Sequence, residues 1–216
     1  SFEIVDLPLI RYVAATGKPM IMSTGMSSEQ EIDEAVTAAR DAGCSDLILL
    51  HCISSYPAPM DQANLRQIPE LARRFNVLTG LSDHTMGTAA SIASVCLGAC
   101  LIEKHFTLDR ADKGPDSVFS IEPKELETLC KDAKDAWLAL GVGGYQRHKA
   151  EEGSMVFRRS LYFVKNLPAG HVIEAQDIRS IRPGRGLPPK HLPKLIGRRL
   201  KVSASRGQPT SFDCFE

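Results

Sequence analysis

The sequence predicts an α/β fold built on a parallel sheet, followed by a smaller domain with little helix. Three observations lead to this prediction. Over the first 140 residues, short continuous apolar runs alternate with helical patterns at a spacing of roughly 20–30 residues. No glycine-rich dinucleotide turn follows any of these runs, which weakens an open nucleotide-binding sheet. Beyond Gly153 the alternation ends, and short strand-like pieces, turn residues and basic residues take over.

The first elements are a short helix over 5–15 and a brief apolar strand over 19–23. Ser28 followed by Glu31 is a capping box, which starts the next helix, and Gly43 ends that helix. The remaining predicted elements are a strand at 46–51, a helix at 69–75, a strand at 77–81, a helix at 88–97, a strand at 100–103 and a helix striped from 126 to 140.

These elements make four strand–helix units, half the number in an eight-stranded barrel. Continuous apolar strands indicate a sheet covered on both faces, and the sheet could close as a barrel or stay open. Residues 1–140 are expected to form this domain, with a glycine-rich linker over 141–157. A compact domain over 158–216 should then contain a strand at 160–164, a turn at 166–170 and a rigid basic loop at 182–189.

Composition limits the classes of function. The chain has 216 residues, a net charge of zero and no run long enough to span a membrane. The charge is uneven, because residues 1–156 hold 14 Lys and Arg against 22 Asp and Glu, whereas residues 157–216 hold 12 against 4. Six scattered cysteines without CxxC spacing favour a reducing cytoplasm. Ser1 does not begin a signal peptide, and the chain is expected to start in the middle of a domain.

Two histidines follow neighbouring predicted strands. His84 ends the stretch Gly80-Leu-Ser-Asp-His, and His105 ends Leu101-Ile-Glu-Lys-His. The carboxyl ends of parallel strands meet at one edge of a sheet, so the two imidazoles are expected to lie together. A single histidine at such a position is usually structural, but the pair is consistent with a shared metal or catalytic site.

Six collinear motifs resemble those of the sialic acid synthase family, the phosphoenolpyruvate-dependent synthases of nonulosonic acids. They are Lys18–Met26, His51–Pro57, Gly80–Thr85, Glu103–Phe106, Gly114–Asp116 and Arg182–Gly184. The resemblance implies the C-terminal half of a (β/α)8 TIM barrel followed by an antifreeze-like (SAF) domain. It also implies condensation of phosphoenolpyruvate with an open-chain N-acetylated aldose, which releases phosphate.

Residues 1–10 and 114–120 look most like pseudaminic acid synthases, which implies 2,4-diacetamido-2,4,6-trideoxy-altrose as the sugar. N-acetylneuraminate and legionaminate synthases are the alternatives within the family. The family's first four strands and their basic phosphate-binding residues are not matched. If the polypeptide starts at Ser1, the expectation is an open barrel edge, an incomplete phosphate site and no turnover.

The resemblance also implies roles for individual residues. His84 and His105 match metal ligands, for Mn²⁺ or alternatively Mg²⁺ or Co²⁺. The residues matching the phosphoenolpyruvate site are Ser1, Ser23, Ser54 and Ser82. The residues matching the sugar site are Glu3, Tyr56, Asp116 and Arg182, and either carboxylate could move protons. In the family the SAF domain carries the arginine into the partner's barrel, so a homodimer is expected.

Two readings of another kind remain open. The basic C-terminal domain could bind nucleic acid or polysaccharide, although it is poor in aromatic residues that stack on bases. Alternatively, the barrel could be an aldolase that forms a Schiff base, for which Lys104 is the one strand-end lysine. Lys104 could equally add charge near a phosphate or point to solvent.

Overall fold

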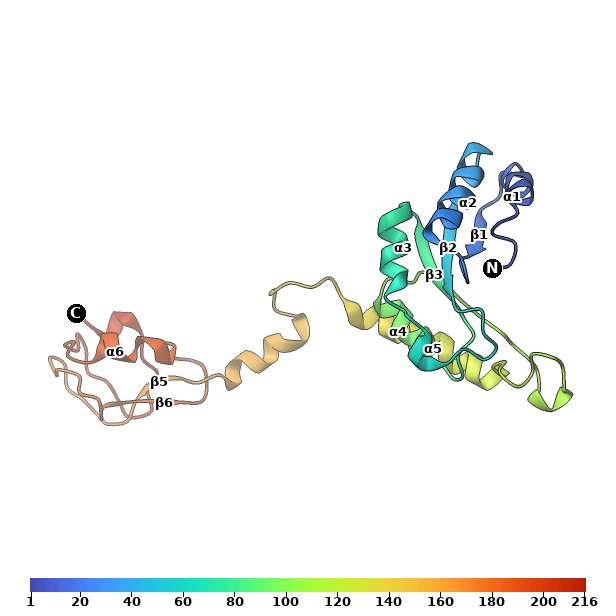
Figure 1. Cartoon of the computed structure of the whole chain (residues 1–216). Helices are drawn as coiled ribbons and strands as arrows, with labels where there is room; N and C mark the ends of the chain where they lie inside the picture. Colours follow the sequence, from blue (N-terminus) through green and yellow to red (C-terminus); the bar gives the residue numbers. More distant parts are fainter. The chain divides into compact units, whose positions relative to one another are not determined.

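The computed structural model describes all 216 residues and divides the chain into two compact units, Ser1–Gly143 and Gly144–Glu216. The first unit contains a parallel sheet of four strands in the order β1-β2-β3-β4, and the first three are labelled in Figure 1. The strands are β1 (Met20–Ser23), β2 (Leu47–Cys52), β3 (Leu78–Asp83) and β4 (Ile102–Lys104). The prediction of four parallel strands is therefore confirmed.

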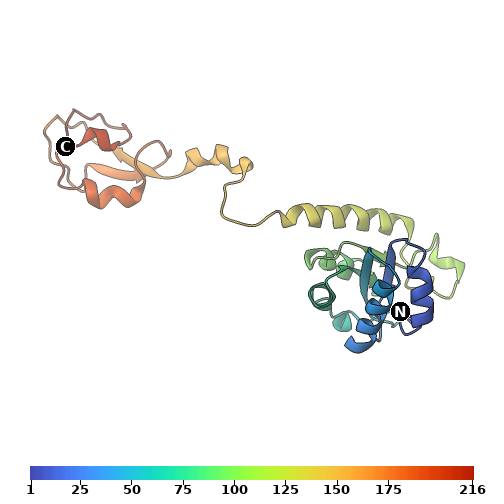
Figure 2. The ribbon, with the colours of Figure 1, turned by 90° about the horizontal axis from the view of Figure 1, so that it is seen from above.

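One helix precedes β1 and four connect or follow the strands, and the longest is the yellow-green helix of the first unit in Figure 2. They are α1 (Leu7–Ala14), α2 (Glu29–Asp41), α3 (Gln67–Phe75), α4 (Ala89–Cys96) and α5 (Pro123–Leu140). The predicted capping box at the start of α2 is present, because the Ser28 N–H donates to Glu31 Oε2 at 2.7 Å and the Glu31 N–H donates to Ser28 Oγ at 3.3 Å.

Alternation along the strands separates two faces of the sheet. Side chains such as Met22, Leu49 and Leu71 pack in one core between the sheet and the first three helices. On the opposite face Ile21 is 49% exposed and Leu78 is 63% exposed. The expectation that both faces are covered is met only in part, because Leu50 lies on the same face as Ile21 and Leu78 but is fully buried.

The second unit is built around a two-stranded antiparallel ribbon of β5 (Ser160–Phe163) and β6 (Ile178–Ile181). Its other elements are the 3₁₀ segments Lys149–Phe157, Pro189–His191 and Phe212–Cys214, and the short helix α6 (Leu192–Leu195). Its own core includes Leu161, Phe163 and Ile178. Residues 149–157, expected as linker, form a 3₁₀ segment, and the Gly184 N–H donates to the Val156 carbonyl at 2.8 Å.

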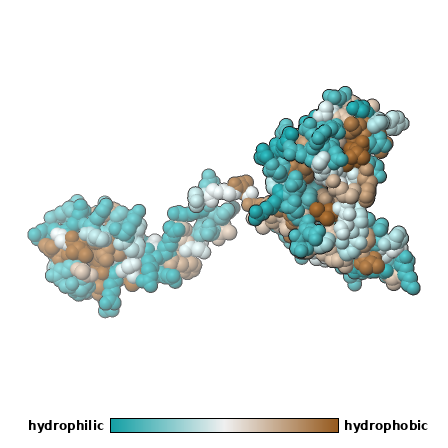
Figure 3. All heavy atoms as spheres, viewed as in Figure 1, coloured by the Kyte–Doolittle hydropathy of each residue, from teal (hydrophilic) through white to brown (hydrophobic).

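The surface is mainly hydrophilic, with hydrophobic residues interrupting it on both units (Figure 3). None of the helices has the length and apolar character needed to cross a membrane. All six cysteines are free thiols.

Candidate active site

The polar residues at the ends of the four strands gather at the carboxyl edge of the sheet. Because all four strands are parallel, the chain leaves each strand at this same edge. The residues there are Ser23 at the end of β1, Cys52 at the end of β2 and Ser54 after it, Ser82 to His84 at the end of β3, and Glu103 to His105 at the end of β4.

The two histidines lie together, as predicted. The ring centroids of His84 and His105 are 5.2 Å apart, with the rings nearly perpendicular. Tyr56 packs against His84 with a centroid separation of 4.2 Å, and Phe119 packs against His105 at 5.0 Å. His84 is buried, whereas the His105 side chain is 31% exposed. The pair therefore has an aromatic wall and one ring open to solvent.

Backbone contacts fix both histidines. The Nδ1 atom of His84 lies 2.9 Å from the Ile53 carbonyl oxygen, which assigns the Nδ1–H tautomer and leaves Nε2 as a free ligand. The His84 carbonyl accepts from the Ala58 N–H at 2.9 Å, and the His105 carbonyl accepts from the Ile121 N–H at 2.8 Å. Burial opposes the charged imidazole, but contacts with Cys52 and Ile53 hold the pKa of His84 above its ordinary value.

The donor set fits a divalent metal ion. Two imidazoles at this separation can share one ion, whose bonds to nitrogen are about 2.1 Å long, and a carbonyl that holds the other ring N–H is typical of metal-binding histidines. No third His, Cys, Asp or Glu completes a cluster with them. Two protein ligands would leave several positions for water or substrate, which suits Mn²⁺.

A cluster of hydroxyl and thiol groups lies beside the histidines. Ser1 Oγ donates to Cys52 Sγ at 3.4 Å, and Ser54 Oγ is 3.7 Å from the same sulfur. A Cβ on Gly25 would lie 2.2 Å from Ser54 Oγ and 2.8 Å from Ser1 Oγ, so these groups meet only because residue 25 has no side chain. Burial disfavours the thiolate, but contacts with His84 and the serine hydroxyls hold the pKa of Cys52 below its ordinary value.

The other predicted phosphoenolpyruvate residues, Ser23 and Ser82, lie on the sheet face that carries Ile21 and Leu78, which is called the open face below. Ser82 Oγ donates to Glu103 Oε1 at 2.7 Å, across the pairing of β3 with β4. Ser23 is half-buried at the end of β1 and has no side-chain partner in the structure. Ser1, Glu3 and Ser23 border a groove of about 290 Å³ between α1 and β1, and Glu3 is exposed there.

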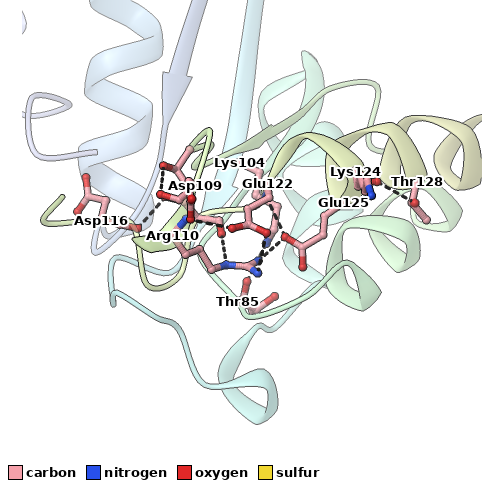
Figure 4. Close-up of polar contacts among 11 residues, drawn as sticks. Thr85, Lys104, Asp109, Arg110, Asp116, Glu122, Lys124, Glu125 and Thr128 are labelled. Carbon is pink, nitrogen blue, oxygen red and sulfur yellow. Dashed lines mark hydrogen bonds and ion pairs between the residues drawn. The ribbon is translucent and has the colours of Figure 1, made fainter. Parts of the chain in front are cut away.

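Asp116 reaches the histidines from the loop between β4 and α5. Its Oδ2 atom is 3.6 Å from His105 Nδ1. Arg110 braces this loop, since its Nε donates to the Ser120 carbonyl at 2.9 Å and its guanidinium group contacts Glu122 and Glu125 (Figure 4). His84, His105, Tyr56 and Asp116 therefore lie in one cluster.

Lys104 is not available as a free amine. Its Nζ lies 3.0 Å from Asp83 Oδ2, and the two side chains are 3% and 1% exposed. Burial opposes ionisation of Asp83, but bonds from Ser91 and Lys104 hold the pKa of Asp83 below its ordinary value. The Schiff-base alternative therefore loses its basis, because a Schiff base needs an accessible neutral amine. The phosphate and solvent alternatives lose theirs as well, because the Lys104 side chain is buried and paired with Asp83.

Arg182 belongs to the second unit. Its side chain is exposed and has no ion pair in the structure. The loop that carries it is anchored by Ser160, whose hydroxyl donates to the Pro183 carbonyl at 2.8 Å and accepts from the Gly186 N–H at 2.9 Å.

Three residues of the cluster were not predicted as site residues: Gly25, Cys52 and Glu103. Gly25 and Cys52 lie inside motifs at predicted strand ends, so their positions were a signal. The alternation of side chains along β4 could have found Glu103, since it points to the same face as Ser82.

Both units match known protein families. Residues 1–145 match the NeuB family, and residues 158–216 match the SAF domain. The chain is 36% identical over 217 residues to pseudaminic acid synthase of Helicobacter pylori, covering 100% of this chain and 64% of the relative. It is 37% identical over 201 residues to N,N'-diacetyllegionaminic acid synthase of Campylobacter jejuni, covering 92% and 60%.

A solved structure supports the same fold. The crystal structure of N-acetylneuraminic acid synthetase from Leptospira borgpetersenii, in complex with citrate, superposes with a TM-score of 0.66 at 35% identity. The match covers 71% of this chain and 53% of that protein. The chain spans 64% and 60% of the two curated relatives named above. The barrel-type α/β fold with an SAF domain is thus confirmed, and the chain belongs to the NeuB family of sialic acid synthases.

Proposed function

We propose that this chain carries part of the active site of a nonulosonic acid synthase. The reaction joins C3 of phosphoenolpyruvate to the aldehyde carbon of an open-chain N-acetylated aldose, after which water attacks C2 and phosphate leaves. The observation that carries this proposal is the convergence of two imidazoles with serine hydroxyls and carboxylates at one sheet edge.

The serine hydroxyls are proposed to hold phosphoenolpyruvate. Ser1 and Ser54 meet around Cys52, and Ser82 lies on the same open face beside Glu103. Hydroxyl groups can donate to phosphate or carboxylate oxygens without adding charge. We assign Ser23 the same role from the family motif, and its hydroxyl has no competing partner.

Polarisation of the sugar aldehyde is the second requirement. His84 Nε2 and the exposed ring of His105 are proposed to hold Mn²⁺, Mg²⁺ or Co²⁺. Bound there, such an ion would withdraw charge from the aldehyde oxygen. Tyr56 and Phe119 exclude water from one side of the imidazoles, and the Ile53 carbonyl keeps the His84 proton on Nδ1.

Carboxylates are proposed to bind the sugar hydroxyls and to move protons. Asp116 is exposed beside His105, and Glu3 borders the groove next to Ser1. Either can accept a proton from the attacking water or give one to the new alkoxide. A glutamine or asparagine at each position would keep the hydrogen bonds and remove the proton transfer, which separates the two roles.

Arg182 is proposed to bind the acetamido group of the sugar in a homodimer, with the SAF domain of one copy serving the barrel of the other. Its exposure and lack of an ion pair leave it free for a ligand. The excess of basic residues in 157–216 complements an anionic substrate pair.

The proposed sugar is 2,4-diacetamido-2,4,6-trideoxy-altrose, which would make the enzyme a pseudaminic acid synthase. The alternatives are the legionaminate precursor and N-acetylmannosamine. Identities of 36% and 37% to relatives of different specificity do not distinguish these sugars. The motifs at 1–10 and 114–120 support the first choice.

The test is phosphate release from phosphoenolpyruvate with Mn²⁺ and a panel of the three sugars. It is run on the 216-residue chain and on a longer chain that also supplies the part of the relatives' length not spanned here. In the longer chain we expect turnover with one sugar and none after His84→Ala. Release that is independent of any sugar, or unchanged in His84→Ala, contradicts the proposal.

A further inference from the structure

Lys104 links the two residues that flank His84, and it does so from the strand that carries His105. Its ammonium group lies 3.0 Å from Asp83 Oδ2 and donates a 2.7 Å hydrogen bond to the Thr85 carbonyl oxygen. Asp83 precedes His84 and Thr85 follows it, while Lys104 directly precedes His105. One side chain of β4 therefore holds the backbone on both sides of the first imidazole.

The polar groups around Asp83 are fully paired and buried. Its Oδ1 accepts from the Thr85 N–H and from the Thr85 hydroxyl, each at 2.8 Å, and its Oδ2 accepts from the Ser91 hydroxyl at 2.5 Å. The Asp83 and Lys104 side chains are 1% and 3% exposed. Burying two charges costs desolvation energy, and an apolar pair often gives equal stability, so this pair needs a reason beyond stability.

Its place in the sheet supplies that reason. Asp83 is the register partner of Lys104, so the next residues along the two strands are the two histidines. The pair lies on the helix-covered face with Ser91 of α4, whereas Ser82 and Glu103 are bonded on the open face. The two strand ends are thus fastened on both faces immediately before the imidazoles.

We propose that Lys104 is a positioning residue for the divalent metal site, and that its contacts with Asp83 and Thr85 fix the spacing of His84 and His105. The inference rests on the proposed function, in which these imidazoles bind the metal. Lys104 touches neither substrate nor metal in this arrangement. Replacing a residue that orients metal ligands without binding the metal typically changes metal affinity 10–100-fold.

The test substitutes Lys104→Met in the 216-residue chain, which keeps the aliphatic stem and removes both contacts. The dissociation constant of Mn²⁺ is measured by electron paramagnetic resonance, after circular dichroism shows that the variant is folded. We expect binding to weaken by about tenfold or more. Lys104→Gln keeps a donor on a shorter side chain and should give a smaller loss, which protects the test if the methionine variant fails to fold.

A matched control is Lys165→Met. Lys165 Nζ is 2.8 Å from the buried Asp177 in the second unit, and the Lys165 side chain is 49% exposed, so the same substitution breaks a lysine–aspartate pair away from the histidines. The control should lower the thermal stability of the second unit and leave the Mn²⁺ dissociation constant unchanged. An equal loss of Mn²⁺ binding in this control would mean that Lys104 acts only through general stability, which overturns the proposal.

A second measurement needs no metal. The ¹⁵N shifts of the imidazoles report the tautomer, and we expect one Nδ1–H tautomer for His84 that becomes a mixture in the folded Lys104 variants. Unchanged imidazole shifts overturn the positioning role, as does Mn²⁺ binding equal to wild type. Failure of the unsubstituted chain to bind Mn²⁺ instead refutes the metal site, and the shift measurement then still decides whether Lys104 positions His84.

Discussion

The Ser82 hydroxyl donates a 2.7 Å hydrogen bond to the Glu103 carboxylate across the β3–β4 pairing. The serine proton is therefore directed to a neighbouring strand. A phosphate oxygen that accepts this hydrogen bond must replace the Glu103 carboxylate as the acceptor. This contact connects the proposed phosphoenolpyruvate site to the strand of His105.

Ser82→Ala should weaken phosphoenolpyruvate more than sugar. The loss of one hydrogen bond is worth about 1 kcal/mol, so the KM for phosphoenolpyruvate should rise about fivefold with the KM for sugar nearly unchanged. The measurement is initial-rate kinetics in a chain that turns over. Glu103→Gln is the comparison, because it keeps an oxygen that can accept the Ser82 proton, and its effect on this KM should be smaller. A larger effect on the sugar KM than on the phosphoenolpyruvate KM would remove Ser82 from the phosphate site.

Gly25→Ala should displace the serine hydroxyls. The new Cβ would lie 2.2 Å from Ser54 Oγ and 2.8 Å from Ser1 Oγ, so both must move. Overpacking of this kind costs about 1 kcal/mol or more of stability, and phosphoenolpyruvate affinity should fall with it. The control is Gly153→Ala, where a Cβ meets no atom within 4 Å. Thermal unfolding measures the stability, and titration with phosphoenolpyruvate measures the affinity. Identical behaviour of both variants would show that Gly25 is not needed to bring the Ser1 and Ser54 hydroxyls together.

Asp177 should control the acid stability of the second unit. It accepts from Lys165 and His171, each at 2.8 Å, and from the Glu174 N–H at 2.9 Å. Burial opposes ionisation, but these donors outweigh it and lower the pKa of Asp177 to about 2. The folded state therefore binds this proton less readily than the unfolded state does. Its stabilisation is present above the unfolded pKa of about 4 and is lost as the pH falls towards 2.

Asp177→Asn should remove that part of the pH dependence. The free energy of unfolding near neutral pH should drop by roughly 2 kcal/mol, as expected for lost hydrogen bonds to a charged group, and its slope between about pH 4 and pH 2 should flatten. Denaturant unfolding across this pH range measures both quantities. Asp213→Asn, at an exposed carboxylate, is the control. An Asp177→Asn curve parallel to wild type would show that other carboxylates govern acid unfolding.

Local patterns were sufficient for most elements of the first unit. The four apolar runs and the Ser28–Glu31 box predicted strands and a helix start that the structure confirms. The predicted start at Pro69 was two residues late, because α3 begins at Gln67. Proline is tolerated throughout the first turn of a helix, where its missing N–H has no partner to lose, so it does not mark the first residue.

The contacts of the site depend on strand register, which the sequence alone does not determine. Lys104 had three open alternatives because its direction is set by the pairing of β4 with β3, and that pairing brings it to Asp83. The strand β6 was missed because its four residues, Ile178–Ile181, are few and do not alternate between apolar and polar. Ser160 likewise gave no signal, since its partners lie more than twenty positions away.

Ser160→Ala should act on the sugar through Arg182. The Ser160 hydroxyl bonds both the Pro183 carbonyl and the Gly186 N–H, so it ties together the two sides of the loop that begins at Arg182. Ser160 is buried, and its loss leaves the Gly186 N–H without a partner, while the Pro183 carbonyl keeps only the Arg185 N–H; an unsatisfied buried group costs about 1–3 kcal/mol of stability in the second unit. The loop should then hold the guanidinium group less firmly.

Kinetics of three variants separate this effect from simple destabilisation. Arg182→Ala should raise the KM for the acetamido sugar with little change in the KM for phosphoenolpyruvate, and Ser160→Ala should do the same to a smaller degree. Ser203→Ala, at an exposed serine without a side-chain hydrogen bond, should change neither. In the double variant the Ser160 effect should largely disappear, because an alanine at 182 leaves no guanidinium group to position. Additive effects in that variant would mean that Ser160 and Arg182 act on the sugar independently.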